Sequence, residues 1–248
     1  MVFYSLFRSF FVTALLLFTS MAAHAADSDE WEFGAEVYLW GASIDAKPTG
    51  GDNIHISFSD ILDNLDGALM TTLSARKGKW SLFSDIIYLN IEDDQKGKVD
   101  LLGIPIRTDF DVEIKAWIVT TAGGYNIINK DRFSLDLLAG ARYLWLEIPL
   151  DAKIAHKKVK TSPSGHTWDG ILGVKGKYDI SDSWYLSYYL DGGTGDSDFT
   201  WQGRAGMNYR FKKFVASAGY RYLDWDIDGS SLDQLTVKGP YAGVKFLF

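Results

Sequence analysis

Hydrophobic and polar residues alternate along most of the chain after about residue 30. In the last ten residues, Ala242, Val244 and Phe246 share one parity, and Gly243 and Lys245 share the other. A period of two is typical of a β-strand whose two faces meet different surroundings. Ten segments with this pattern are bounded by turn residues and predict strands at 31–43, 68–76, 80–91, 109–127, 133–147, 168–178, 184–192, 199–211, 214–226 and 235–248.

The connections between these segments alternate in length. Short turns at 77–79, 128–131, 179–183 and 212–213 alternate with longer polar loops at 44–67, 92–108, 148–167, 193–198 and 227–234. Short periplasmic turns and long extracellular loops are the layout of an outer-membrane barrel. We therefore predict an all-β fold, a closed antiparallel transmembrane β-barrel of about ten strands, with eight or twelve as the other possible counts.

The charged residues of most predicted strands fall on one parity. In the segment 133–147, Leu135 and Leu137 alternate with Asp136, and Arg142 shares the parity of Asp136. In the segment 109–127, the residues of even number from Phe110 to Ile118 are apolar, whereas Asp111, Glu113 and Lys115 lie between them. A Lys or Arg that faces lipid near the midplane costs about 2–4 kcal/mol, so we expect the charged parity to face the lumen. The segment 80–91 gives no clear assignment, because Asp85 shares its parity with Phe83 and Ile87.

Aromatic residues gather at the short-turn ends of the predicted strands, as in an interfacial girdle. A soluble β-sandwich is the rival interpretation, since its apolar face would pack on a second sheet. It explains neither the aromatic girdle nor the terminal aromatic residue. The residues concerned are Trp31, Trp80, Phe133 and Trp184 at strand starts, and Tyr178, Phe211 and Phe248 at strand ends.

The N-terminal residues predict an exported protein. Arg8 precedes the apolar run at 10–18, and "AHA" at 23–25 is a small-residue cleavage pattern, so we expect a cleaved secretory signal peptide at 1–25 and a single barrel domain at 26–248. Nine apolar residues are too few to cross about 30 Å of hydrocarbon as a helix. The cell outer membrane is the expected location.

The composition argues against several classes of function. The chain has no cysteine, which excludes disulfides and thiol chemistry. Its net charge of -7 argues against a nucleic-acid partner. We expect no cofactor.

The charges on the inward parity predict a polar lumen crossed by ion pairs. Two interpretations stay open, a salt-bridged plug with a structural role and a narrow path for small solutes, because a ten-stranded barrel is only slightly wider than one that side chains fill. The predicted lumen charge network consists of Glu36, Asp111, Glu113, Lys115, Asp136, Arg142, Asp169, Lys175, Asp191, Arg204, Arg221 and Lys245.

Two of the predicted outer loops carry opposite charges. The loop at 148–167 is basic and is a candidate for contact with the phosphates of lipopolysaccharide, through Lys153, Lys157, Lys158 and Lys160. It could equally pair with the acidic first loop, which contains Asp45, Asp52, Asp60, Asp63 and Asp66. Within the first loop, "SDILDNLDG" predicts one helical turn, capped by Ser59 or Asp60, that could fold over or into the barrel mouth.

Signals for a metal site and for catalysis are weak. Asp224, Asp226 and Asp228 follow the order of a calcium loop, but position twelve is Leu235 instead of glutamate, so we expect a solvated hairpin and no metal. The alternatives to a structural or passage role are an outer-membrane lipid or peptide hydrolase and an adhesin-like interaction barrel. A hydrolase would need a His beside an acid or a Ser at the outer rim, and after the signal only His55, His156 and His166 remain. We expect no enzyme.

Several stretches resemble a widespread family of uncharacterised proteobacterial outer-membrane β-barrel proteins. They are "SFSDILDNLDGALM" from 57, "WSLFSDIIYL" from 80, "LLAGARYLWL" from 137, "SDFTWQGRAGMNYRF" from 197, "GYRYLDWD" from 219 and "GPYAGVKFLF" at the end. The chain departs from the family at Gly170 and Lys175, where proline and arginine are usual, which weakens any inference of a shared lumen function. The resemblance supplies no catalytic residues.

The chain end also resembles the signal that the barrel-assembly machinery reads, carried here by Val244, Phe246 and Phe248. The expected partners are therefore this machinery during insertion, and outer-membrane lipid and lipopolysaccharide afterwards. We expect a monomer.

Overall fold

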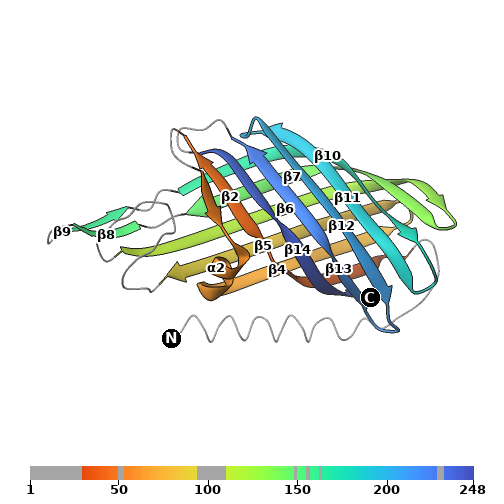
Figure 1. Cartoon of the computed structure of the whole chain (residues 1–248). Helices are drawn as coiled ribbons and strands as arrows, with labels where there is room; N and C mark the ends of the chain where they lie inside the picture. The colour runs from red at the N-terminus through yellow and green to blue at the C-terminus, as the bar shows by residue number, and fades with distance from the viewer. Residues whose placement is uncertain are drawn as a thin grey trace.

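The chain forms a closed ten-stranded antiparallel β-barrel with strongly tilted strands (Figure 1). The computed structural model describes residues 30–49, 53–93, 110–147, 150–154, 157–161, 164–227 and 232–248. The barrel strands are β1 (Glu32–Trp40), β4 (Leu65–Lys77), β5 (Trp80–Asp93), β6 (Phe110–Lys130), β7 (Phe133–Glu147), β10 (Ser164–Asp179), β11 (Trp184–Gly195), β12 (Phe199–Arg210), β13 (Val215–Asp226) and β14 (Leu232–Leu247).

Each barrel strand pairs with its neighbours in the chain, and the first strand pairs with the last. The register of β1 on β14 runs from Gly34 opposite Leu247 to Trp40 opposite Tyr241. This pairing leaves no free edge, which is how a barrel avoids the unpaired backbone groups that lipid cannot satisfy. The predicted closed barrel of about ten strands is confirmed, and so is the place of the chain end in its closing strand.

The two ends of the barrel differ in their connections. At the short-turn end, β4 and β5 are joined by a two-residue turn in which Gly78 has a φ of 55°, a conformation that glycine adopts without strain. At the long-loop end, the chain adds β2 (Ser43–Pro48), β3 (Ile54–Ile56), α2 (Phe58–Asp63), β8 (Leu150–Ile154) and β9 (Lys157–Thr161). Figure 1 shows α2 and the β8–β9 hairpin at the end of the barrel opposite to the C-terminus.

One connection that the sequence predicts to be a long loop is short in the structure. The segment 193–198 was expected to be a loop, but β11 continues to Gly195 and β12 begins at Phe199. The residues Gly192 to Gly195 contain little side-chain mass and three glycines, which hide the strand pattern, although their backbones pair with β10.

The outer wall of the barrel is apolar between two belts of aromatic pairs. The belt at the short-turn end contains Trp80 on Tyr125 and Trp184 on Tyr209, each pair with ring centroids 4.8 Å apart. A second belt at the long-loop end, which the sequence pattern did not predict, contains three pairs at 4.6–4.7 Å. On β5, Trp80 and Tyr88 of the two belts are eight positions apart, or about 27 Å along the strand, which fits a tilted strand across an apolar band about 25 Å tall. The three outer pairs are Tyr88 with Trp117, Tyr143 with Trp168, and Trp201 with Tyr222.

The parity expected for β6 is wrong. Ile118 is buried inside the barrel and pairs with the inward Ile87, whereas Lys115 lies on the parity of the outward Trp117. The strand is 21 residues long, so its first residues extend beyond the outer belt, where charges on the outer wall meet water instead of lipid. On β5, which the pattern left unassigned, Asp85 and Ile87 both face inward.

No helix in the described ranges is long and apolar enough to cross a membrane.

The barrel lumen as candidate functional site

The side chains inside the barrel form three layers along its axis. The layer at the long-loop end is apolar, the middle layer consists of buried ion pairs, and the layer at the short-turn end is an open polar cavity. The predicted polar, salt-bridged lumen therefore describes two of the layers and misses the third.

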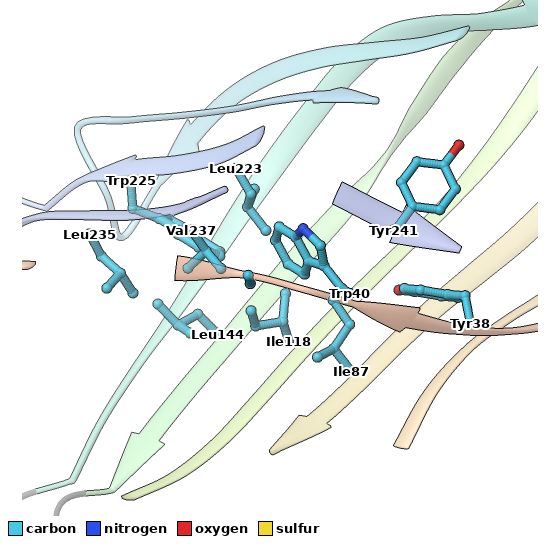
Figure 2. Close-up of a cluster of buried hydrophobic side chains, with 11 residues drawn as sticks. Tyr38, Trp40, Ile87, Ile118, Leu144, Leu223, Trp225, Leu235, Val237 and Tyr241 are labelled. Atoms are coloured by element: carbon cyan, nitrogen blue, oxygen red, sulfur yellow. The ribbon is translucent and has the colours of Figure 1, made fainter. Parts of the chain in front are cut away.

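The apolar layer is a plug of large side chains contributed by β1, β5, β6, β7, β13 and β14 (Figure 2). Leu223 and Trp225 are 0% exposed. The indole Nε1 of Trp40 donates a hydrogen bond of 3.2 Å to the carbonyl of Gly239, so this polar atom is satisfied inside the plug. Packed protein interiors contain few voids larger than a water molecule. The members are Tyr38, Trp40, Ala42, Ile87, Ile118, Leu144, Leu223, Trp225, Leu235, Val237 and Tyr241.

Above the plug, α2 covers the barrel mouth, as the sequence allowed. Ile61 of α2 is buried against Ile56 and Ile91. The helix is capped by Ser57 and not by Ser59 or Asp60, since the Ser57 hydroxyl accepts a hydrogen bond from the Asp60 amide. Asp60 completes a capping box, because its carboxylate accepts hydrogen bonds from the hydroxyl and the amide of Ser57, and these two bonds hold the pKa of the Asp60 carboxyl below its ordinary value.

The first ion pair of the middle layer joins β7 to β11. The Arg142 guanidinium lies 2.5 Å from the Asp191 carboxylate, and both side chains are 0% exposed. Arg142 also donates to the hydroxyls of Thr120 and Thr200, at 3.3 and 2.9 Å. Since β10 lies between β7 and β11, this pair connects two strands that do not touch through their backbones.

The second ion pair joins β13 to β5 across the lumen. Arg221 lies 2.8 Å from Asp85 and donates to the Gln202 amide oxygen at 2.6 and 3.1 Å. The Tyr38 hydroxyl accepts from Arg221 and donates to Asp85, both at 2.8 Å. Arg221 was predicted to belong to the network. Its partners were not predicted, because nothing in the local pattern indicates that Asp85, Gln202 and Tyr38 of distant strands meet Arg221.

The cavity at the short-turn end has a volume of about 520 Å³. Arg204 lies 2.7 Å from Glu36, and Arg76 pairs with Asp136. Lys175 and Lys245 also line the cavity. The structure thus brings together the predicted residues Glu36, Asp136, Lys175, Arg204 and Lys245, and Arg76 lies with them.

The remaining predicted network residues lie elsewhere. Asp169 is buried at the long-loop end, where it accepts hydrogen bonds from the amide and hydroxyl of Ser197, at 2.9 and 2.5 Å, and so holds the β11–β12 connection. Lys115 is on the outward parity of β6. Asp111 and Glu113 belong to the outer extension of β6, and their side chains lie outside the described residues.

The predicted loop and metal residues are only partly described. The lysines Lys153, Lys157, Lys158 and Lys160 belong to the β8–β9 hairpin, whose backbone pairs with β6, and their side chains lie outside the described residues. The Asp224 carboxylate accepts hydrogen bonds from Thr236 and Gln234. Asp226 is exposed at the end of β13, and Asp228 lies outside the described residues. Among the residues with described positions, no three His, Asp or Glu side chains are placed to hold a metal ion.

The last strand has the orientation that its alternation predicts. Phe246 is 44% exposed on the outer wall, on the same parity as Val244, and Lys245 lines the cavity. Phe248 exchanges two backbone hydrogen bonds with Phe33, at 3.1 and 2.9 Å. Recognition of Val244, Phe246 and Phe248 by an assembly machinery stays a prediction.

A histidine does lie beside an acid at the long-loop end. The His55 Nδ1 is 2.5 Å from one Asp45 oxygen, and the Lys238 ammonium is 2.9 Å from the other. Partial burial acts to raise the pKa of Asp45, but the hydrogen bonds from His55 and Lys238 outweigh it and hold that pKa below its ordinary value. Asp45 of β2 thus binds His55 of β3 through one oxygen and Lys238 of β14 through the other, so its carboxylate connects the three strands.

No protein-family model and no curated protein sequence matches the chain. Among solved structures, the outer membrane protease OmpT from Escherichia coli matches with a TM-score of 0.51 and 9% identity, over 91% of this chain and 99% of that one. The translocator domain of the autotransporter NalP from Neisseria meningitidis matches with a TM-score of 0.49 and 14% identity, over 99% of this chain and 96% of that one. At 9% identity, the likeness to OmpT establishes the fold of an outer-membrane β-barrel and no shared activity.

Proposed function

We propose that this chain is an outer-membrane β-barrel with a structural role, closed to solutes in its resting form. The observation that carries the proposal is the pair of consecutive layers across the lumen, the ion-pair layer and the apolar plug. Of the two interpretations that the sequence left open, these layers favour a plug over a narrow path. The short-turn end would face the periplasm, and the proposed role includes no catalysis.

Ion conductance in planar bilayers tests the proposal. We expect no unitary conductance steps from the wild-type protein, because the Arg142–Asp191 pair and Trp225 leave no aqueous path. The triple variant Arg142→Ala, Asp191→Ala and Trp225→Ala removes side chains from both layers, and we expect it to give steps. Trp201→Ala is the matched control, since it removes the same side chain from the outer wall at the same end. Regular steps from the wild type would contradict a closed barrel.

Membership of the proteobacterial family, a monomeric state, and contact of the β8–β9 lysines with lipopolysaccharide stay predictions. No specific observation favours the adhesin alternative. The hydrolase alternative gains no support either, because the His55–Asp45 pair already holds β2 and β3 together. Hydrolysis of a lipid or peptide that is lost in a His55→Ala variant would revive the hydrolase.

A further inference from the structure

We infer that the cavity at the short-turn end binds a small oxyanion with two negative charges, such as a phosphate or a dicarboxylate, between Lys175 and Lys245. The inference goes beyond a structural role and concerns only the side of the lumen below the closing layers.

The cavity carries an excess of positive charge. Within the described part of the chain, six basic and four acidic side chains line it. Three of the four acids are consumed by arginines, in the pairs Glu36–Arg204, Asp136–Arg76 and Asp85–Arg221. A fourth base, Lys177, lies 3.2 Å from Asp179 outside the lining, a carboxylate that it shares with Arg210.

The two remaining bases are Lys175 and Lys245. No ion pair joins either ammonium to a carboxylate among the residues that the structure describes. The last acid of the lining is Glu32, which is exposed at the open rim. The cavity therefore holds two ammonium groups whose charge the protein itself does not neutralise.

The strand register places an acid opposite each lysine, but other side chains already bind that acid. Lys175 is directly opposite Asp136 on β7, and Lys245 is directly opposite Glu36 on β1, so each has an acid on the adjacent strand. Asp136, however, already accepts hydrogen bonds from Arg76, Asn126 and Ser81.

Glu36 is also engaged, through one of its two carboxylate oxygens. One of its oxygens accepts from Arg204 at 2.7 Å and from the Ser217 hydroxyl at 2.8 Å. In both cases the acid opposite the lysine pairs with an arginine from another strand instead. Each lysine is therefore available to bind a different anion.

The surroundings keep both lysines inside the cavity. The Lys175 ammonium lies 4.6 Å from the centroid of the Phe83 ring, a cation–π contact that supports a charge without neutralising it. The stem of Lys245 passes over Gly34, where an added Cβ would lie 3.0 Å from the Lys245 Cε and 2.7 Å from the Ser74 hydroxyl. Glycine at position 34 leaves the space that the lysine occupies.

The size and access of the cavity fit a small ligand. About 520 Å³ is within the range of about 300–1,000 Å³ that is typical of small-molecule sites. Two ammonium groups in a cavity match a compact dianion, and a phosphate monoester carries a charge of about -1.5 to -2 at pH 7. Since the lumen is closed on its other side, the ligand would enter through the short-turn end.

Calorimetric titration of the full chain, refolded in detergent micelles at constant ionic strength, tests the inference with inorganic phosphate and succinate as probes. We expect saturable binding of at least one probe. The probe that binds more tightly identifies the chemical class of the ligand. The double variant Lys175→Gln and Lys245→Gln should bind at least tenfold more weakly. Lys212→Gln, which removes a lysine from the β12–β13 turn outside the cavity lining, should bind like the wild type.

Two further variants keep the test decisive if the glutamine variant does not fold. The double variant Lys175→Arg and Lys245→Arg keeps both charges and should keep binding. Asp136→Asn releases Arg76 and should strengthen binding, because it adds a third unneutralised cation. The inference is overturned if the wild type binds neither probe saturably, or if neither the glutamine pair nor Asp136→Asn changes the affinity.

Discussion

The guanidinium of Arg142 is removed from water in the middle of the barrel, with one carboxylate and two threonine hydroxyls as its partners. Taking a charge out of water costs several kcal/mol, and the cost is recovered only if the ion is paired and its hydrogen bonds are made. Asp191 supplies the counter-charge through Oδ2, which also accepts a hydrogen bond from Tyr189, whereas its buried Oδ1 has no hydrogen-bond partner among the described residues. The ionic layer is therefore stable only as a complete set.

This dependence predicts strong coupling between Arg142 and Asp191. Asp191→Asn leaves an arginine buried without its counter-charge, and we expect a loss of about 3–5 kcal/mol in the free energy of unfolding. The double variant Arg142→Met and Asp191→Leu replaces both ions by apolar side chains and should lose less than Asp191→Asn alone. Equilibrium unfolding by urea in lipid vesicles compares these variants, and the wild type, Arg142→Met, Asp191→Leu and the double variant together form a double-mutant cycle. Additive losses would show that the two side chains act independently.

The elements at the barrel mouth extend the wall beyond the membrane. Both β1 and β2 pair with β14, with Trp40 opposite Tyr241 and Ser43 opposite Lys238, so one line of pairing continues past the interruption between β1 and β2. The β2–β3 hairpin has only three paired positions. The contacts of the outward Asp45 with His55 and Lys238 therefore help to hold the hairpin on the barrel.

The low pKa of Asp45 makes this hairpin sensitive to acid. A group whose pKa is lowered by folding stabilises the fold above its unfolded pKa, which is about 3.9 for Asp, and the stabilisation is lost as the pH falls through the folded pKa. Amide hydrogen exchange at Ile54–Ile56, expressed as protection factors, should show constant protection from pH 6 to 5 and a decrease below about pH 4. Asp45→Asn should lower protection at pH 6 and remove most of the change. An unchanged pH profile in that variant would assign the effect to other carboxylates.

The strands were predictable because lipid imposes one rule on every outward position between the belts, namely that the side chain is apolar. Where the strand leaves that band, as at Lys115 on β6, the rule ends and the assignment failed. The plug was missed because Ile118 and Leu223 stand on inward positions, where the pattern predicts polar residues but the lumen also accepts apolar ones. The ion pairs could not be assigned, since Arg221 and Asp85 are 136 positions apart and meet only across the closed barrel.

The molecule as a whole separates two surroundings with one sheet. Outside, apolar side chains lie between two aromatic belts, and beyond the outer belt the wall becomes polar at Lys238, Thr236 and Asp45. Inside, the surroundings change from charged to apolar along the axis. A soluble sandwich would bury one continuous apolar face, whereas here the apolar Leu172 is 71% exposed on the outer wall.

A charge placed on the outer wall tests this membrane assignment directly. Leu172 lies on β10 between Trp168 of the outer belt and Tyr178 near the short-turn end, and it faces away from the lumen. Leu172→Lys should therefore cost about 2–4 kcal/mol of unfolding free energy in lipid vesicles, because the ammonium would enter the apolar midplane. Leu62→Lys is the matched control, since Leu62 is 55% exposed on α2 above the barrel mouth, and it should cost little. If both variants unfold like the wild type, water covers Leu172 as well, and the outer wall is not in contact with lipid.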